Sequence, residues 1–476
     1  MRNPGVFIGG EWLDSPNSIE NINPSDTQDI VGTFQLATEQ QMRDAVGSAR
    51  AAAAGWASTT TQARSDILSR AAQEMLARKD SLAELVCREA GKTRAEGVGE
   101  VVRAAQVLNF FAGEAVRYGG ENIPSVRPNI SVQVSREALG VVTVITPWNF
   151  PIAIAAWKIG PALAFGNTVV FKPSEYTPAI ACELANIFSR SGLPAGVLNV
   201  VVGDGVTAGE TLLENVDAVS FTGSVGTGHK IAQKTVAGMI RVQLEMGGKN
   251  PLLVLNDADL PTAVECAVNG AFFGAGQRCT ASSRIIVAEG IHDRFVDALN
   301  ERMSKLTVGP ALNSGVDIGP VINQTQLDKC RGYIEVGRRE GAELLRGGGQ
   351  LQGETPGYFL DPALFVGGVN SMRINQEEIF GPVACVIKVA DYEEGLNVAN
   401  DTPFGLSAGI CTQSISVANH FRNNIKSGLA MVNLPTAGLD YHVPFGGRKA
   451  SSYGPREQGR YAVDFYTITK TSYVSY

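Results

Sequence analysis

Residues 141–171 read VVTVITPWNFPIAIAAWKIGPALAFGNTVVF, and this stretch decides the fold. A β-branched run at 141–145 is followed by an apolar segment with helical spacing at 152–165 and by a second β-branched run at 168–171. A strand, a helix and a strand in this order predict two parallel strands that are joined by a right-handed crossover.

The same alternation continues toward the C-terminus. Further strands are expected at 197–202, 218–221 and 240–244, and the helices between them at 177–191, 206–214 and 226–237. Five strands with four crossovers predict an α/β fold with a doubly wound parallel sheet.

Helices are also expected before this sheet and a second α/β unit after it. Apolar residues recur three or four apart within 41–117, with an interruption from Gly91 to Gly99, which predicts amphipathic helices that cover the sheet. Beyond Pro251, strands are expected at 284–288, 383–389, 405–411 and 429–432. These strands predict a second domain that ends near residue 437.

Composition narrows the class of protein. The chain has 476 residues with 40 Lys and Arg against 47 Asp and Glu, and it contains no basic run that would neutralise a row of phosphates. Hydrophobic residues make up 44% and charged residues 18%, which is typical of a packed globular protein. With neither an 18-residue apolar span nor a targeting pattern at 1–10, we expect a cytoplasmic protein that binds neither nucleic acid nor a membrane.

The spacing of the cysteines and histidines argues against a metal site and against disulfides. The seven cysteines lie at least 13 residues apart with no Cys-x-x-Cys pair, and the four histidines never fall at ligand spacing. We therefore expect reduced thiols and no bound metal.

Ligands of open parallel sheets bind beyond the carboxyl ends of the strands. Polar residues and glycines follow the expected strands at 147–149, 172–175, 203–205 and 222–224, and Glu245 follows the last strand. A Lys and two Glu are harder to explain as turn formers than Asn, Gly and Pro, so we expect a binding site at this edge.

Two glycine patterns follow strands here. Gly223-Ser-Val-Gly-Thr-Gly228 opens a helix whose N-terminus is suited to a pyrophosphate, although it is neither a Walker A loop nor the usual G-x-G-x-x-G. The Gly203-Asp-Gly205 pattern favours a tight turn.

Cys279 differs from five other cysteines that lie in apolar contexts, namely Cys87, Cys182, Cys266, Cys385 and Cys411. It follows Gly274-Ala-Gly-Gln-Arg278, a tight polar turn in which backbone groups and the Arg278 charge are expected to favour the thiolate. A nucleophilic cysteine without a nearby histidine needs another base, and Glu245 is the expected proton acceptor.

Seven separated motifs together resemble the aldehyde dehydrogenase superfamily. They are Pro147-Trp-Asn-Phe-Pro151, Phe171-Lys-Pro-Ser-Glu175, Phe221-Thr-Gly-Ser224, Leu244-Glu-Met-Gly-Gly-Lys249, Gly276-Gln-Arg-Cys279, Glu378-Ile-Phe-Gly-Pro382 and Pro444-Phe-Gly-Gly-Arg-Lys449. The resemblance covers nearly the whole chain in the same order, beginning at Ile8-Gly-Gly-Glu-Trp12.

The resemblance implies a three-part organisation. The NAD(P)-binding domain would comprise 1–117 and 140–247 with part of 438–460, and the catalytic domain 248–437. Residues 118–139 and 461–476 would form an oligomerisation segment, whose strand-like 130–136 and 466–473 would be exposed edges in a monomer. A homodimer or homotetramer is therefore expected.

The resemblance also implies the mechanism. The Cys279 thiolate attacks an aldehyde, the Asn149 amide and the Cys279 backbone N–H hold the oxyanion, and Glu245 activates the water that hydrolyses the thioester. Lys172 completes the essential set, and Glu457 matches a proton-relay position. The residues implied for NAD or NADP are Trp148, Lys172, Ser174, Glu175, Gly223, Ser224, Gly228, Glu378 and Phe380.

The substrate is expected to enter an apolar tunnel. The residues implied there are Phe150, Trp157, Phe273, Arg278, Thr280, Leu439 and Phe445. The run from Gly276 to Arg284 looks like that of enzymes acting on carboxylated semialdehydes such as 2-oxoglutaric semialdehyde, and Arg278 would pair with the carboxylate. The alternative is that Arg278 makes a structural salt bridge.

Three other functions stay open on the sequence. They are a broad or aromatic aldehyde dehydrogenase, a CoA-acylating relative and a catalytically silent structural protein. The presence of Glu245 argues against CoA acylation, because such relatives lack a glutamate at this position. The intact set of Cys279, Glu245, Asn149 and Lys172 argues against a silent protein.

Overall fold

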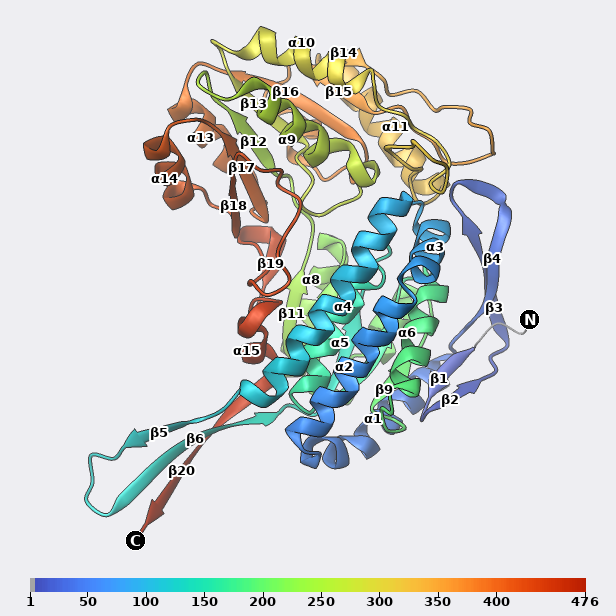
Figure 1. Ribbon diagram of the computed structural model, residues 1–476, viewed down its shortest axis with the longest axis vertical. Coiled ribbons are helices and arrows are strands. Elements are labelled where there is room, and N and C mark those ends of the chain that lie inside the picture. The colour runs from blue at the N-terminus through green and yellow to red at the C-terminus, as the bar shows by residue number, and fades with distance from the viewer. Residues whose placement is uncertain (1–4) are drawn as a thin grey trace.

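The computed structural model describes residues 5–476, which form two large, mainly parallel sheets, a three-stranded arm and a two-stranded ribbon (Figure 1). The strand order of the first sheet is β19-β11-β10-β7-β8-β9-β1-β2. Its parallel centre consists of β7 (Val141–Ile145), β8 (Thr168–Lys172), β9 (Leu198–Val200), β10 (Ala218–Thr222) and β11 (Arg241–Glu245). All five predicted strands and the doubly wound fold class are confirmed.

The edges of this sheet escaped prediction. They are β1 (Val6–Ile8), β2 (Glu11–Leu13) and β19 (Ser452–Tyr453), and each pairs antiparallel with its neighbour. Two or three residues are too few to display a period, so these strands give no sequence signal.

The crossover helices lie where they were expected. They are α5 (Ala153–Ala164), α6 (Pro178–Arg190), α7 (Gly205–Thr211) and α8 (Val225–Ala237). The covering helices are α1 (Glu39–Ser58), α2 (Thr61–Ala77), α3 (Lys79–Ala90) and α4 (Arg94–Arg117).

The predicted interruption from Gly91 to Gly99 is wrong over its second half. Gly91 ends α3 with φ 68°, but Thr93 begins α4 again through a capping box with Glu96. The helix then runs through Gly97, where an added Cβ would lie 2.8 Å from Cys87 Sγ. A glycine that permits close packing of α4 on α3 looks, in the sequence alone, like a helix breaker.

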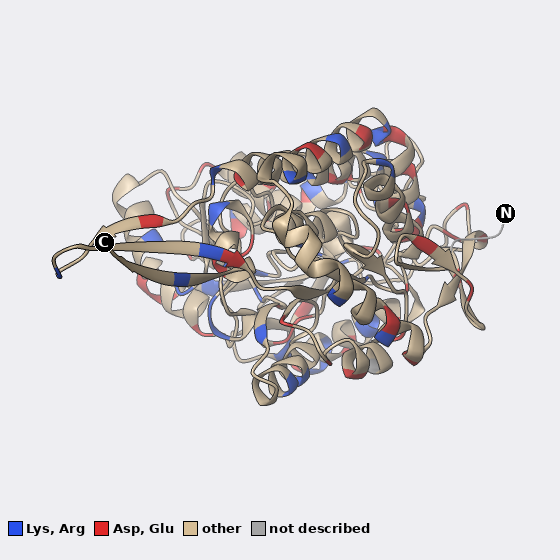
Figure 2. Cartoon of the chain, turned by 90° about the horizontal axis from the view of Figure 1, so that it is seen from below, with Lys and Arg blue, Asp and Glu red and all other residues tan. Residues whose placement is uncertain are grey.

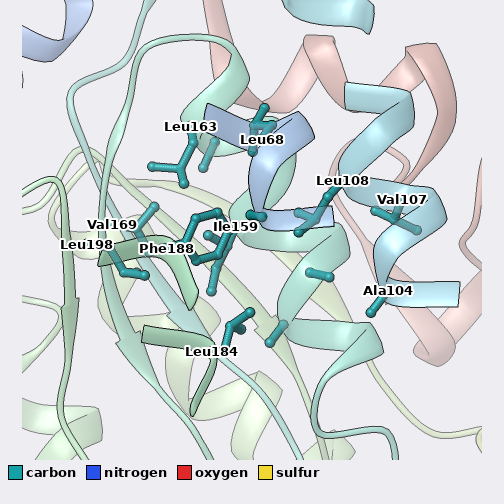
Figure 3. Packing of buried hydrophobic residues seen from close by; sticks show 14 of the residues in the cluster. Leu68, Ala104, Val107, Leu108, Ile159, Leu163, Val169, Leu184, Phe188 and Leu198 are labelled. Carbon is teal, nitrogen blue, oxygen red and sulfur yellow. The ribbon is translucent and has the colours of Figure 1, made fainter. Parts of the chain in front are cut away.

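The hydrophobic core of the first domain packs its helices against the first sheet. Figure 3 shows Leu68 of α2, Leu108 of α4, Ile159 of α5 and Phe188 of α6 gathered against Val169 of β8, and all five are buried. Burying a side chain of this size contributes about 1.5–3 kcal/mol.

The second sheet has the order β14-β15-β16-β13-β12-β17-β18. Its strands are β12 (Pro251–Val254), β13 (Arg284–Ala288), β14 (Glu343–Arg346), β15 (Ala363–Val366), β16 (Val383–Val389), β17 (Ser407–Cys411) and β18 (Leu429–Val432). The helices around it are α9 (Leu260–Phe272), α10 (His292–Met303), α11 (Gln324–Arg339), α12 (Arg373–Gln376), α13 (Tyr392–Asn400) and α14 (Ile415–Asn424). The four predicted strands are confirmed.

An arm projects from the body at the lower end of Figure 1. It consists of β5 (Glu121–Pro124), β6 (Ile130–Ala138) and β20 (Thr467–Ser475), and β20 follows α15 (Val463–Tyr466). The predicted strand therefore begins one residue later than expected, because Tyr466 ends a helical turn. Figure 2 shows acidic and basic residues interspersed along the arm and the body.

A polar ribbon joins the N-terminal part to the second domain. It consists of β3 (Asn17–Asn23) and β4 (Asp26–Leu36). Pro24 O accepts from Tyr358 N at 3.0 Å, and Ser25 Oγ accepts from Ala311 N at 3.1 Å. Residues 1–4 belong to the expected NAD(P)-binding domain and to the stretch 1–10 that lacks a targeting pattern, and they lie outside the described residues. Within residues 5–476 no helix is long and apolar enough to cross a membrane.

Candidate active site

A cavity of about 280 Å³ lies where α4, the segment from 148 to 157, the Cys279 loop and the segment from 437 to 445 meet. Its wall is largely apolar, as is usual for a small-molecule site. The expected residues in its lining are Trp148, Asn149, Phe150, Trp157, Arg278, Cys279, Thr280, Leu439 and Phe445. Phe273 is not in the lining, because it packs against the core of the second domain instead.

The loop that carries Cys279 begins with an unusual backbone turn. α9 ends at Phe272, and Gly274 and Ala275 then adopt left-handed conformations with φ 64° and 53°. Gly276 follows with φ 64°, and an added Cβ there would lie 2.3 Å from Gly381 O. This turn reverses the chain within three residues and brings Cys279 to the cavity.

Side chains of the second domain hold this loop in place. Asn250 Nδ2 donates to Cys279 O at 2.8 Å and to Ala281 O at 2.9 Å, and Thr436 Oγ1 donates to Thr280 O at 2.6 Å. The backbone around the thiol is therefore fixed before any ligand binds.

Cys279 is partly exposed, whereas the other six cysteines are buried. Burial and, to a lesser extent, the Glu378 and Glu245 charges raise the pKa of its thiol to about 12, against the backbone N–H groups of Cys279 and Thr280, which lower it. The charges of Cys279 and Arg278 also interact, since the Cys279 charge raises the pKa of Arg278. The thiol is thus protonated in this state, and a base has to remove its proton.

Asn149 lies against the same loop. Its Nδ2 donates to Gln277 O at 3.0 Å, and its buried Oδ1 has no partner among the described residues. Asn149 and Cys279 both line the cavity, so the amide and the sulfur face a common space.

Glu245 is the last residue of β11 and lies behind the cavity wall. Its side chain is buried, and Ser452 Oγ donates to Oε2 at 2.5 Å. Oε1 lies 2.8 Å from the position of a Cβ at Gly446, next to the lining residue Phe445. Burial raises the pKa of Glu245 well above its usual value, and the Glu457 charge raises it further. Ser452, Lys158 and Arg456 act in the opposite direction.

A buried ion pair lies beside Glu245. Lys158 Nζ bonds to Glu457 Oε1 and donates to Ser220 Oγ at 2.9 Å, and both charged side chains are almost fully buried. Glu457 Oε2 has no partner among the described residues.

Groups suited to a dinucleotide lie at the carboxyl edge of the first sheet. Ser224 Oγ caps α8 by accepting from Thr227 N at 3.3 Å. Added Cβ atoms at Gly223 and Gly228 would lie 2.5 Å from the Phe221 ring and 2.4 Å from Met246 Sδ. Phe221 and Met246 therefore pack directly against these two glycines at the start of the helix.

The remaining expected cofactor residues occupy two places. Lys172 Nζ lies 3.3 Å from Glu175 Oε2 beyond β8, where Ser174 is buried. On the second domain, Glu378 Oε1 accepts from Gly248 N at 3.1 Å, and the Phe380 and Trp148 rings meet edge to face at 5.4 Å.

Arg278 lines the cavity, but one of its groups is already engaged. Nη2 donates to Asn269 O of α9, whereas the buried Nε has no partner among the described residues. The alternative of a structural salt bridge is wrong, because the bond is to a backbone carbonyl. Burial lowers the pKa of Arg278.

Six polar residues of the lining were not predicted from the sequence. They are Lys92, Glu96, Glu100, Arg103, Gln277 and Gln458. Lys92 pairs with Glu100 at 2.5 Å, and its Nζ lies 3.4 Å from the centre of the Phe150 ring. Glu96, Glu100 and Arg103 belong to α4, where polar residues of an amphipathic helix are expected on the solvent side, and their spacing of three or four residues was the signal that could have grouped them.

Comparison with known proteins agrees with this geometry. The aldehyde dehydrogenase family model matches residues 12–472. The chain is 44% identical to the alpha-ketoglutaric semialdehyde dehydrogenase of Bacillus subtilis, over 98% of this chain and 97% of that protein. It is 43% identical to the alpha-ketoglutarate semialdehyde dehydrogenase of Haloferax volcanii, over 99% and 98%. The solved betaine aldehyde dehydrogenase of Staphylococcus aureus in complex with NAD+ has a TM-score of 0.97 at 34% identity, over 99% and 95%.

Proposed function

The chain belongs to the aldehyde dehydrogenase family, and on that premise we propose that it oxidises a carboxylated semialdehyde to the corresponding acid. As a member of this family it is an oxidoreductase that uses NAD or NADP. The observation that carries the substrate proposal is the Arg278 guanidinium, which lines a largely apolar cavity next to Cys279 and has an unpartnered Nε.

The first chemical step belongs to Cys279. Its thiol loses a proton toward Glu245, and the sulfur attacks the aldehyde carbon to form a thiohemiacetal. The Asn149 amide and the Cys279 backbone N–H donate to the oxyanion as its charge develops. The clamped loop keeps these donors in position, so no reorganisation is needed during attack.

The residues at the first sheet fit a dinucleotide. The glycine-rich start of α8 suits a pyrophosphate, with Ser224 and Trp148 as its contacts. Lys172, Ser174 and Glu175 would hold the adenosine ribose, and Glu378 and Phe380 the nicotinamide ribose. Held by these residues, NAD or NADP would supply the hydride acceptor for the oxidation.

Release of the acid needs a base that can bind a water proton. Glu245 is shielded from solvent and its pKa is raised, so its carboxylate is a stronger base than an exposed glutamate. The proton then passes toward Glu457 and Lys158, which are buried beside Glu245. In this proposal Glu245 first takes the thiol proton and passes it on toward Glu457, and the regenerated carboxylate then takes the proton of the water.

The three-part organisation is part of the proposal. The first domain would hold the cofactor and the second would supply Cys279, with residues 118–139 and 461–476 as the oligomerisation segment. The outer edge of β20 and the β18 edge of the second sheet are both unpaired within the described chain. Unpaired edges favour association, so we propose a homodimer or homotetramer in the cytoplasm.

An aldehyde panel tests the proposal. The enzyme is incubated with NAD or NADP and either 5-oxopentanoate or pentanal, with and without CoA. We expect NAD(P)H without CoA and a higher kcat/KM for 5-oxopentanoate. Equal efficiencies would favour a broad or aromatic aldehyde dehydrogenase, CoA dependence an acylating enzyme, and no turnover a silent protein.

A further inference from the structure

One face of α4 forms a wall of the substrate cavity. Glu96, Gly99, Glu100 and Arg103 all belong to the cavity lining. Their spacing of three or four residues places them along one stripe of the helix. Four consecutive positions on this stripe thus face the substrate instead of the apolar core.

Most of the charges on this wall are already paired. Lys92 bonds to Glu100 Oε2 at 2.5 Å, and Glu100 Oε1 accepts from Ile152 N at 3.0 Å. Glu96 Oε2 accepts from the N–H and hydroxyl of Thr93, both at 3.0 Å, as the cap of its own helix. Each of these groups has a structural task at the start of a helix or between helices.

Arg103 is the exception. Its guanidinium is half-buried in the cavity wall, and it makes no hydrogen bond or ion pair with any residue among 5–476. Burial lowers its pKa, and only the charges of Asp440 and Tyr441 oppose this effect. An unpaired guanidinium in a largely apolar wall costs free energy unless an anion joins it.

Arg278 and Arg103 are not equivalent. Arg278 is adjacent to the nucleophile in the chain, and its Nη2 already donates a hydrogen bond to the Asn269 carbonyl. All five N–H donors of Arg103 are available for a ligand, and its planar fork matches a carboxylate. Of the two groups, Arg103 is the better suited to a bidentate contact.

We propose that Arg103 is a specificity-determining residue that binds the distal carboxylate of the substrate. This inference rests on the proposed function, since it names the residue that recognises the carboxylated end. The aldehyde lies at Cys279, the apolar chain packs along Phe150 and Trp157, and the carboxylate pairs with Arg103.

The test uses Arg103→Gln and Arg103→Lys in the full-length enzyme. The control is Arg94→Gln. Arg94 lies on the same helix, but it is exposed and its ion pair with Glu84 is long at 3.9 Å. Steady-state kinetics are measured with 5-oxopentanoate and with pentanal. Glutarate, a dicarboxylate without an aldehyde, is used as a dead-end inhibitor of pentanal oxidation.

We expect Arg103→Gln to lower kcat/KM for 5-oxopentanoate by roughly 10- to 100-fold, mainly through KM, because a charge-assisted contact is lost. Pentanal oxidation stays within about threefold of wild type, and the glutarate Ki rises by a factor similar to that in KM. Arg103→Lys keeps the charge but not the fork and gives intermediate values. Arg94→Gln leaves all three quantities unchanged.

The outcomes separate this inference from the proposed function. If the wild type does not prefer 5-oxopentanoate, the substrate proposal fails. If it does, and Arg103→Gln keeps both that preference and the glutarate Ki while Arg278→Gln loses them, Arg103 is not the carboxylate-binding residue. If Arg103→Gln loses pentanal turnover, Arg103→Lys takes its place in the test. An unchanged substrate preference and an unchanged glutarate Ki in Arg103→Lys would then also overturn the inference.

Discussion

Ser452 and Glu245 lie opposite each other in the antiparallel pair of β19 and β11, and Ser452 Oγ donates to Glu245 Oε2 at 2.5 Å. The same hydroxyl accepts from Gly447 N at 2.6 Å, which fixes its direction. This bond favours the carboxylate form of Glu245, whereas burial and the Glu457 charge favour the neutral form. The basicity of Glu245 is therefore set by neighbours that act in opposite directions.

Replacing Ser452 by Ala removes a bond to the charged form of Glu245, so the pKa of Glu245 rises. Because the base acts as a carboxylate, the acidic limb of the kcat profile moves to higher pH, by about one unit for a charge-assisted bond. Rates of NADH formation across pH measure this shift. Ser81→Ala, at an exposed position of α3, is the control. If the acidic limb of the kcat profile does not shift, the pKa of Glu245 does not control the rate-limiting step.

Replacing Glu457 by Gln should have the opposite effect. It removes a negative charge beside Glu245 and leaves Lys158 without its carboxylate partner, so the pKa of Glu245 falls. The acidic limb then moves to lower pH, by roughly one unit. A shift in the same direction as that of Ser452→Ala would contradict the assigned charges. The rate at the plateau reports separately whether Glu457 carries protons.

Glu245→Gln should separate the two halves of the reaction. The variant lacks the base that deprotonates Cys279 and activates water, so we expect a burst of about one NADH for each active site that forms more slowly than in wild type, followed by a steady rate at least 100-fold below wild type. Cys279→Ala is expected to show neither phase, because no thiol attacks the aldehyde. Rapid-mixing absorbance measurements distinguish these cases, and wild-type turnover by Glu245→Gln would exclude it as the base.

Glu175→Gln tests the choice of cofactor. A glutamate accepts a hydrogen bond from the ribose 2′-OH of NAD but repels the 2′-phosphate of NADP, although Lys172 lies 3.3 Å from it and offsets part of that repulsion. We expect the ratio of NADP to NAD efficiency to rise by about tenfold, which corresponds to about 1.4 kcal/mol. An unchanged ratio would show that Glu175 does not set the preference.

Glu100→Ala should destabilise the protein through the start of α5. The substitution leaves buried Lys92 unpaired and removes the acceptor of two backbone N–H groups, at Ile152 and Ala153. Breaking a buried pair costs about 3–5 kcal/mol. Denaturant unfolding measures the loss. Glu84→Ala, whose exposed partner Arg94 lies 3.9 Å away, should cost less than about 1 kcal/mol, and equal losses would argue against the buried pair.

The central strands could be predicted because β-branched and other apolar residues recur between turn residues at regular intervals along the chain. The residues of the five strands from β7 to β11 are almost all buried, although β11 also contains Arg241, Gln243 and Glu245. The ribbon of β3 and β4 is mostly polar and exposed, and it therefore resembles a loop. The strand β14 escaped prediction because its four residues are at best half-buried.

The site residues differ in a similar way in how far the sequence predicts them. Asn149 and Glu245 could be proposed because they lie at the carboxyl ends of strands, and Cys279 because it lies in a polar turn. Lys92 lies in the loop between α3 and α4 and Arg103 lies on α4, and the sequence of a helix does not state what lies opposite its polar face. The prediction that Phe273 lines the tunnel was wrong. An apolar side chain close to Cys279 in sequence can pack either in the tunnel or in the core behind it, and the sequence does not distinguish the two.

Because six of the seven cysteines are buried, labelling of the remaining cysteine can be used to count intact active sites. In the native protein a bulky maleimide should modify one sulfur per chain, that of Cys279, because the others are inaccessible to solvent. The extent of that modification gives the concentration of intact sites, independently of any aldehyde. Under denaturing conditions the count rises to seven, so one reagent reports both the fraction of competent enzyme and the onset of unfolding.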